Sequence, residues 1–439
     1  MASANIDSRT AGVTKTIVVH YHELWLKKGN RSFFLHKLRE ALRRALEGIA
    51  IARISQPADR LVIELGGDAD LEEALRRLER VSGISHLGVA RVIGRTAGAR
   101  ESSEDDQVAA IRAAAWEEIR GEQFSTFAVR ARRSDKSFPL NAMALERDVG
   151  GYLFDRLQAE GRRARVDLKN PALTCRIEVT RGPVLVYARR IPGAGGLPPN
   201  TAGKLLCLLS GGFDSAVAAF KMMKRGAHVS FVHFWGGGAL PGESSVHVAR
   251  QLVERLVPWQ FTTRLYLVPF EPLQREIAAR TAEPFRTLLY RRLMLRIAER
   301  LALRGGAKGL VTGDSLGQVA SQTLQNMQAV GAIARLPLYR PLVGDDKLEI
   351  QELARRIGTH DISAEPFHDC CPVFQSKSPA LYATPEALDA EEEKLEVTAL
   401  VERGLDSASL ERYRYAQGKV ERTQSSADAA GKRVSSHSG

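Results

Sequence analysis

The feature that most restricts the fold is the stretch KLLCLLSGGFDS at residues 204–215. Its nearly continuous apolar run, 204–209, is typical of a strand buried on both faces, as in a parallel sheet. A Ser-Gly-Gly turn follows, and a helix is expected to begin at Asp214. Apolar strands and helices then alternate, which predicts a doubly wound parallel α/β sheet. Further strands are expected at 229–234, 264–268 and 309–312, and helices at 215–225, 246–256, 285–303 and 347–357.

The Ser-Gly-Gly turn has the residues needed to bind phosphate. Glycines let the backbone approach a ligand closely, and the free amides at a helix start favour an anion. Ser210 and Ser215 can donate to phosphate oxygens, and Asp214 can hold a magnesium ion on them. Such a turn by itself is a weak signal and is more often a plain strand–helix connection, but the flanking Asp and Ser after a buried strand favour phosphate. It is not a Walker loop, because no Gly-Lys-Ser/Thr follows.

SGGFDS resembles the pyrophosphate-binding loop of the N-type ATP pyrophosphatases, or PP-loop enzymes. The resemblance implies an enzyme that cleaves ATP between the α and β phosphates. Such enzymes adenylate a carbonyl oxygen and then replace it with a nitrogen or sulfur nucleophile. ATP and Mg²⁺ are therefore the expected cofactors, with Asp214 as a catalytic residue and metal ligand.

A second informative stretch is VTGDSLGQVASQTLQNMQ at 311–328. Residues 312–315 form another strand-to-helix turn able to meet a nucleotide, and Gln318, Gln322 and Gln325 are expected on one face of a helix. An ordinary amphipathic helix with a polar face is the alternative. TGDSLGQVASQTL, together with the pattern RPL-x3-DK-x-EI-x-ELAR-x-IGT after it, is similar to the bacterial tRNA 4-thiouridine sulfurtransferases, the ThiI family.

The N-terminal half has a different order of elements. A strand at 16–21, a helix at 30–48, short strands at 51–55 and 60–65, a helix at 70–81 and a strand at 87–93 give the ferredoxin-like order β-α-β-β-α-β. VVHYHELWLKKGNRSFF resembles the start of the family's N-terminal domain, although the usual R-Y-G-E becomes HYHE. The region ending in LKNPALTCRIEV resembles the THUMP domain that holds tRNA.

These observations predict a multidomain α/β chain. We expect a ferredoxin-like domain at 15–95, a THUMP domain at 96–190 and a PP-loop domain at 204–396. The linker at 191–203 holds four Gly and three Pro, and a C-terminal extension covers 397–439. Its small, polar residues after Glu421 are expected to be disordered.

Charge indicates a polyanionic partner. The formal net charge is +12, which favours nucleic acid, although a basic solubility surface is the alternative. Basic residues also flank the helix expected at 141–160, where a solvated charged face is the alternative to RNA contact. The residues predicted to bind tRNA are Arg130, Arg132, Arg133, Lys136, Lys169 and Asn170.

The family resemblance also implies the residues that would meet ATP. His233 and Phe234 end an expected strand, where a core histidine is the usual reading, and Arg291 lies on an expected helix, where a surface arginine is usual. The predicted ATP-binding set is Leu208, Leu209, Ser210, Gly211, Gly212, Asp214, Ser215, His233, Phe234, Arg291, Gly313 and Gln322.

The four cysteines exclude a zinc ribbon and a four-thiolate iron–sulfur site, because none forms a C-x-x-C pair. They are also too few for a disulfide scaffold, which favours a reducing compartment. Cys175 and Cys207 fall in expected strands and are predicted to be core residues. In the sequence DCCPVF, the resemblance implies that Cys371 is the reactive thiol, with Cys370 beside it.

Neither a secretory signal nor an apolar run long enough for a membrane span is expected, so the predicted location is cytoplasmic with no membrane association. No rhodanese domain is expected, which implies that a cysteine desulfurase or another persulfide donor supplies sulfur. The sequence leaves the oligomeric state open, a homodimer included.

The resemblance implies an ATP-dependent tRNA uridine 4-sulfurtransferase that adenylates O4 of uridine 8 and replaces that oxygen with persulfide sulfur. A role in thiamine thiazole synthesis is a further implication. One alternative is another PP-loop enzyme that thiolates or amidates a different RNA. The other is a tRNA-binding protein whose ATP site has decayed.

Overall fold

A computed structural model of the chain describes residues 15–21, 23, 28–94, 104–236, 245–364 and 378–425. The chain divides into two compact units. The first unit comprises 1–28 and 46–195, and the second comprises 29–45 and 196–439. Among the described residues, no helix is both long enough and apolar enough to cross a bilayer.

The sheet of the first unit runs in the order β2-β3-β1-β4-β8-β7-β5-β6, with β9 added beside β4. Its first four strands have the arrangement of a ferredoxin-like sheet, as predicted, whereas helix α1 (Arg31–Ala45) belongs with the second unit. The elements of the first unit are β1 (Thr16–His20), β2 (Ile51–Ser55), β3 (Leu61–Leu65), α2 (Leu71–Leu78), β4 (His86–Ile93), α3 (Glu104–Ile119), β5 (Thr126–Arg133), α4 (Ala142–Ala159), β6 (Arg165–Val166), β7 (Leu173–Val179), β8 (Val184–Tyr187) and β9 (Arg190–Pro192).

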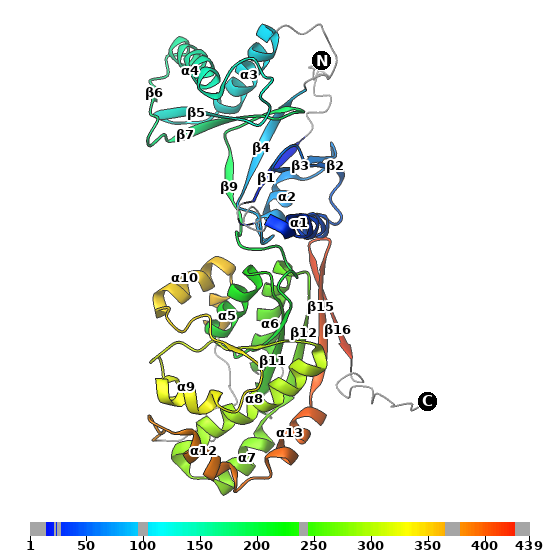
Figure 1. Cartoon of the computed structure of the whole chain (residues 1–439), viewed down its shortest axis with the longest axis vertical. Coiled ribbons are helices and arrows are strands. Elements are labelled where there is room, and N and C mark those ends of the chain that lie inside the picture. Colours follow the sequence, from blue (N-terminus) through cyan, green and yellow to red (C-terminus); the bar gives the residue numbers. More distant parts are fainter. Residues whose placement is uncertain are drawn as a thin grey trace, which may run out of the picture. The chain divides into compact units, whose positions relative to one another are not determined.

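Strand β4 joins the two halves of this unit. Its first part pairs antiparallel with β1, and its last three residues, Arg91–Ile93, pair with β8. On the β8 side, α3 and α4 pack their apolar residues, among them Trp116 and Leu153, onto β5, β7 and β8 (Figure 1). One continuous sheet therefore carries both the ferredoxin-like strands and the strands predicted for the THUMP domain.

A buried polar network ties these strands together. Arg60, which is fully buried, forms an ion pair with Glu178 on β7, and Tyr187 on β8 donates a 2.7 Å hydrogen bond to the same carboxylate. His20 on β1 lies 3.1 Å from Glu178 as well. Although burial would raise the pKa of Glu178, His20, Arg60 and Tyr187 together lower it to about 2. The carboxylate is thus charged and fully surrounded by donors.

The second unit is built on a seven-stranded sheet in the order β14-β13-β10-β11-β12-β15-β16. The first five strands are mutually parallel, and β15 and β16 add an antiparallel hairpin beside β12 (Figure 1). Its elements after α1 are β10 (Lys204–Leu208), α5 (Phe213–Lys224), β11 (His228–Trp235), α6 (Ser245–Leu256), β12 (Thr262–Pro269), α7 (Glu271–Arg280), α8 (Arg286–Gly305), β13 (Leu310–Val311), α9 (Leu324–Gly331), β14 (Leu338–Tyr339), α10 (Lys347–Ile357), α11 (His360–Ala364), α12 (Pro385–Glu392), α13 (Val397–Asp406), β15 (Ser409–Ala416) and β16 (Lys419–Ser425).

Helices cover both faces of this sheet. Leu206 on β10 packs in a core cluster with residues of α7, α8, α9, α12 and α13. Its neighbour Cys207 contacts the carbonyl oxygen of Ser215 in α5, with the sulfur 3.6 Å away. Successive strand residues point to opposite faces, so α5 and α8 lie on opposite sides. The doubly wound α/β fold predicted from the sequence is confirmed.

Two local predictions are wrong. Arg422–Ser425 were expected to be disordered but belong to β16, where each pairs with a residue of β15. Gln318, Gln322 and Gln325 do not share one helix, because 316–319 form a turn and a bend, Ala320–Gln322 form a short 3-10 helix, and α9 begins only at Leu324. Thr323 caps α9 by accepting from the backbone N–H of Asn326, which fixes this later start.

Candidate active site

The chain order reverses between β10 and β13 in the second unit. These strands are parallel neighbours, while β11 and β12 continue on one side and β14 on the other. Ligands of open α/β sheets bind at such a switch point, beyond the carboxyl ends of the strands. The two turns singled out in the sequence, after β10 and after β13, both lie at this point.

The two turns pack closely against each other. A Cβ added to Gly313 would lie only 2.6 Å from the backbone nitrogen of Ser215. No side chain fits there, since Cβ contacts of that length are not tolerated. Gly313 therefore allows the second turn to reach the start of α5.

A cavity of about 210 Å³, which we call the switch-point pocket, opens between these turns. Seven residues of the predicted ATP-binding set line it: Leu208, Ser210, Asp214, Ser215, Arg291, Gly313 and Gln322. The other lining residues are Met294, Leu295, Thr312, Asp314, Val330, Leu338 and Arg340.

The loop before α5 is held in shape by its two serines. Ser215 Oγ accepts from the backbone nitrogen of Ser210 at 3.0 Å and lies 3.1 Å from Ser210 Oγ. Helix α5 begins after Gly212 without a side-chain cap. Uncapped amides at a helix start are a ready anion site, so the loop retains the capacity to bind phosphate.

Asp214 presents an unsatisfied oxygen. Its Oδ2 accepts a 3.2 Å hydrogen bond from Gln318, whereas Oδ1 is buried without a partner among the described residues. Burial raises the pKa of Asp214, against the opposing effects of Gln318 and Lys347. A cation at this carboxylate would stabilise its charged form.

The residues present fit a magnesium ion that also binds phosphate. The described residues hold no group of three or more His, Cys, Asp or Glu side chains able to cage a metal. Mg²⁺ is commonly bound by one or two carboxylates together with substrate phosphates. Oδ1 of Asp214, which no described residue contacts by a hydrogen bond, lies beside the phosphate-loop serines and matches this arrangement.

Asp314 organises the opposite side of the pocket. Its carboxylate forms ion pairs with Arg291 and, at 3.3 Å, with Arg340 Nε. It also accepts from Thr312 Oγ1 at 2.8 Å and from Gln322 Nε2 at 3.4 Å. Although burial opposes it, this set of donors, Arg291 first, lowers the pKa of Asp314. The carboxylate thus fixes two guanidinium groups at the cavity.

Asp314 and Arg340 were not in the predicted ATP-binding set, although the turn at 312–315 was expected to meet a nucleotide. Both stood in quoted motifs, TGDS and RPL, but nothing in the sequence showed that they would meet. The short strand β14 runs parallel to β13, and Arg340 follows β14 directly. This pairing brings the side chain of Arg340 to that of Asp314. The sequence did hold one signal for this contact, because a charged residue follows each of the two strands and the carboxyl ends of parallel strands meet at one edge of a sheet.

Five predicted ATP-binding residues do not line the pocket. His233 is buried in the core, where Nδ1 lies 2.8 Å from the carbonyl oxygen of Leu209 and Nε2 lies 2.9 Å from Ser245 Oγ. Phe234 packs edge-on against Phe270. Leu209, Gly211 and Gly212 belong to the loop but not to the cavity lining.

The cysteines divide into two groups. Cys175 and Cys207 are fully buried, as predicted, and burial raises the pKa of Cys175 to about 12 and also raises that of Cys207. Thiols in such surroundings are inert. Cys370 and Cys371 lie outside the described residues.

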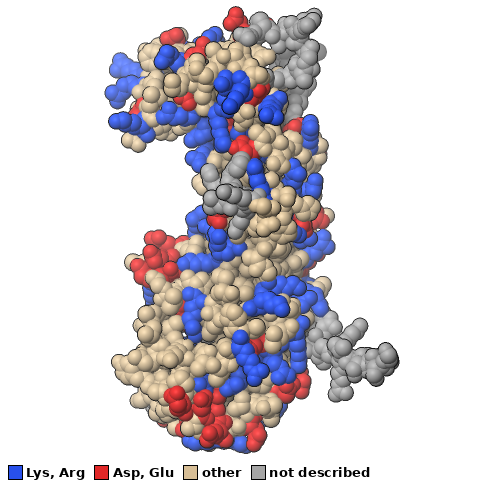
Figure 2. Space-filling model, viewed as in Figure 1, with Lys and Arg blue, Asp and Glu red and all other residues tan. Residues whose placement is uncertain are grey.

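The residues predicted to bind RNA lie in the first unit, on β5 and on the segments after β5 and β6. Arg130 and Arg132 are exposed two residues apart on β5 and so share a face, although Arg130 donates to the carbonyl oxygen of Leu168 and Arg132 forms an ion pair with Asp59. Arg133 is half-buried and donates to the carbonyl oxygens of Phe138 and Leu140. Lys136, Lys169 and Asn170 are exposed. Figure 2 shows basic side chains gathered over the part of this unit that holds α4 and β6.

Comparison with known proteins gives consistent matches along the chain. The family profile described as "Thiamine biosynthesis protein (ThiI)" matches residues 200–397, "ThiI ferredoxin-like domain" matches 16–88, and "THUMP domain" matches 101–189. A "Probable tRNA sulfurtransferase" of Thermus thermophilus is 41% identical over 388 residues, covering 88% of this chain and 91% of the relative. Another of the same name from Moorella thermoacetica is 37% identical, covering 90% and 97%.

A solved structure supports the same relationship. It is described as the crystal structure of a 4-thiouridine synthetase–RNA complex with bound ATP. It has a TM-score of 0.78 at 29% identity and covers 91% of this chain and 99% of the solved chain. PH1313 from Pyrococcus horikoshii matches with a TM-score of 0.57 at 25% identity, covering 78% of this chain and 99% of its own.

Proposed function

This chain belongs to the ThiI family, and we propose that it is an ATP-dependent tRNA uridine 4-sulfurtransferase. The observation that carries the proposal is the meeting of the SGGFDS and TGDS turns at the switch point, around the Asp214 oxygen that has no partner among the described residues. The relatives are named for sulfur transfer to tRNA, and the solved 4-thiouridine synthetase binds both RNA and ATP.

The first proposed step is adenylation. O4 of the uridine attacks the α-phosphorus of ATP, the bond to the β-phosphate breaks, and pyrophosphate leaves. Ser210, Ser215 and the first amides of α5 would bind that pyrophosphate. Asp214 would hold Mg²⁺, which neutralises charge on the phosphates. Arg291 and Arg340, oriented by Asp314, would stabilise the negative charge that develops.

The second proposed step is sulfur transfer. A persulfide sulfur attacks C4, the C4–O4 bond breaks, and AMP leaves with the oxygen. If Cys371 carries the sulfur, its persulfide attacks C4, and a second thiol, that of Cys370 or an external one, then attacks the Cys371 sulfur, so that the S–S bond breaks, a disulfide forms and the outer sulfur stays on C4. If Cys371 instead attacks the inner sulfur of the donor's persulfide, hydrosulfide leaves and attacks C4, and a disulfide joins Cys371 to the donor. In either route an external thiol reduces the disulfide before the next turnover. We propose a cysteine desulfurase or another persulfide donor as the partner, and the cytoplasm as the compartment.

The predicted domains and further roles complete the proposal. Residues 15–95 and 96–190 would bind tRNA through the ferredoxin-like and THUMP domains, with Arg130, Arg132, Lys136, Lys169 and Asn170 facing RNA. The PP-loop domain from 204 onward would act on uridine 8, and its sheet continues beyond the expected end at 396 into β15 and β16. The proposal also includes a homodimer and a contribution to thiamine synthesis.

The direct test is nucleoside mass spectrometry of tRNA incubated with the protein, ATP, Mg²⁺, cysteine and a desulfurase. We expect 4-thiouridine together with stoichiometric AMP. An amidated nucleoside would favour the alternative PP-loop reaction, and tRNA binding without AMP would favour a decayed ATP site. Cys371→Ser should lose activity with the desulfurase and recover part of it with free sulfide, while Cys370→Ser should keep most activity.

A further inference from the structure

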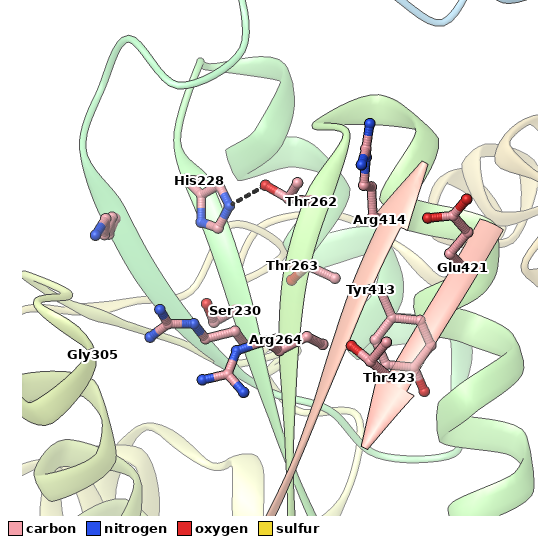
Figure 3. A pocket seen from close by; sticks show the side chains of 12 residues that line it. His228, Ser230, Thr262, Thr263, Arg264, Gly305, Tyr413, Arg414, Glu421 and Thr423 are labelled. Carbon is pink, nitrogen blue, oxygen red and sulfur yellow. Dashed lines mark hydrogen bonds between the residues drawn. The ribbon is translucent and has the colours of Figure 1, made fainter. Parts of the chain in front are cut away.

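A second cavity of the second unit lies at the other end of the same strands. It has a volume of about 480 Å³, and we call it the amino-end pocket. Lys204, His228 and Thr262 are the first residues of β10, β11 and β12, so this pocket opens where those parallel strands begin (Figure 3). The lining residues are Lys204, His228, Ser230, Thr262, Thr263, Arg264, Gly305, Arg412, Tyr413, Arg414, Glu421 and Thr423.

Strand register places like charges face to face in this pocket. In the antiparallel pair of β12 and β15, Arg264 lies directly opposite Arg412. Like charges directly opposite each other destabilise a sheet. Glu421, the one carboxylate among the lining residues, lies opposite Arg414 on the next strand, whereas Arg412 lies opposite Thr423. The lining therefore brings four cationic side chains together with a single acidic one.

The pocket also offers neutral hydrogen-bonding groups. His228 Nε2 lies 3.4 Å from Thr262 Oγ1, whereas Nδ1 is shielded from solvent and has no partner among the described residues. Burial, followed by the charges of Lys204 and Arg264, lowers the pKa of His228. A neutral imidazole, together with the hydroxyls of Ser230 and Thr423, can bond to oxygen atoms without adding charge.

We propose that the amino-end pocket is a second anion site, which binds a phosphate group independently of the switch-point pocket. Guanidinium groups bind phosphate oxygens through paired, charge-assisted hydrogen bonds, and a phosphate between Arg264 and Arg412 would remove the repulsion between them. The volume suits a ligand of nucleotide size, since such sites span about 300–1,000 Å³. An RNA phosphodiester and a free nucleotide present the same group.

The first experiment uses the full chain without ATP or Mg²⁺ and titrates inorganic phosphate. The His228 ring resonance, assigned by its disappearance in His228→Gln, reports on the pocket, and Tm reports on binding linked to folding. We expect phosphate to shift the resonance and raise Tm in the wild type. The control Arg300→Ala, which changes an exposed arginine of α8 paired with Glu402, should respond equally.

The double variant Arg264→Ala/Arg412→Ala should need at least tenfold more phosphate for the same response. It should fold normally, because the substitutions remove the repulsion between the two arginines. An unchanged phosphate response in this variant, or none in the wild type, overturns the proposal.

The second experiment identifies the source of the phosphate by measuring tRNA affinity against salt. If RNA occupies the pocket, the double variant should flatten the slope of log K against log salt by about 0.7–0.9 for each RNA phosphate that is no longer neutralised. If a free nucleotide occupies it, ADP should displace inorganic phosphate and the slope should stay unchanged. Either result supports an anion site. Neither readout requires sulfur transfer, so the proposed enzymatic function and this site can fail separately.

Discussion

The two pockets at opposite ends of the second unit's sheet differ in what lies opposite their arginine side chains. In the switch-point pocket, Arg291 and Arg340 both contact the buried carboxylate of Asp314. In the amino-end pocket, Arg264 faces another arginine, Arg412, across the strand pair. Guanidinium groups held by a carboxylate are fixed before a ligand arrives, which is what transition-state stabilisation requires. Two cations that repel each other are stabilised when an anion binds between them, because the anion removes the repulsion.

This difference teaches that a basic residue near a cavity does not by itself indicate its role. The group that lies opposite the basic residue, a buried carboxylate or another cation, separates a position suited to chemistry from a position suited to attracting an anion. Five predictions follow from it, ordered from the largest expected effect to the smallest.

Replacing Asp214 with Asn should separate the two pockets most clearly. The variant keeps the shape of the loop but loses the charge that would hold Mg²⁺, so AMP formation should fall by about 100–1,000-fold. Its tRNA affinity and the phosphate response of His228 should match the wild type. Asp406→Asn, at an exposed position of α13, is the matched control. Wild-type AMP production by Asp214→Asn would contradict the proposed role.

Replacing Asp314 with Asn should reduce both stability and ATP affinity. Leaving Arg291 and Arg340 without their carboxylate should lower the free energy of unfolding by about 2–3 kcal/mol, because each arginine keeps some solvent access. Asp389→Asn is the control, since that carboxylate, paired with Arg292, is 60% exposed and should contribute at most about 1 kcal/mol.

The pH dependence of the Asp314 effect has a defined sign. The pKa of this carboxyl is lower in the folded chain than its usual 3.8. Its stabilisation is therefore complete above that value and is lost as pH falls through the lowered folded pKa. Urea denaturation at neutral pH and in acid should show the difference between wild type and Asp314→Asn shrinking only in acid. A difference that stayed constant would remove the electrostatic explanation.

Removing Arg130 and Arg132 together should weaken tRNA binding by about tenfold at moderate salt and flatten the salt slope by about 1–2. Arg133→Ala should instead lower Tm with little change in that slope, because Arg133 is half-buried and its guanidinium bonds two backbone carbonyls, whereas the exposed Arg130 bonds one. Filter binding at several salt concentrations provides the measurement. Equal slopes for Arg133→Ala and the double variant would show that the three arginines act alike.

The smallest expected effect concerns His228. Its folded pKa lies below the usual 6.5, so the unfolded chain takes up a proton first as pH falls, and stability decreases below about pH 6.5. His228→Gln should remove this decrease, which we expect to be under about 1 kcal/mol. Saturating phosphate should also reduce it, because an anion near Lys204 and Arg264 raises the folded pKa. Denaturation curves at pH 5 and 7 would detect either change.

Local signals in the sequence predicted much of the second unit. The helix expected at 347–357 matches α10, because Asp346 and Glu349 form a capping box and Gly358 ends the helix at positive φ. Seven predicted ATP-binding residues also meet, since strand ends in a doubly wound sheet converge at the switch point.

Long-range pairing between distant residues explains what was not predicted. A core histidine is the alternative for His233 at the end of a strand, but the two groups that satisfy its ring nitrogens, Leu209 and Ser245, come from other elements and could not be named from the sequence. Strand β16 is polar and would not form alone, but pairing with β15 stabilises it. A signal existed: Gln417 and Gly418, both at positive φ, form the tight turn typical of hairpins.

The hairpin β15–β16 also sets the order in which the second unit can fold on the ribosome. Strand β12 pairs with β11 on one side, but its other edge stays open until β15, Ser409–Ala416, has been made. Translation adds about 5–20 residues per second, so the edge of β12 stays exposed for on the order of ten seconds. Exposed strand edges recruit other chains. The nascent protein therefore passes through an interval in which chaperone capture of β12 competes with aggregation, and slowing translation between β12 and β15 should lower the soluble yield.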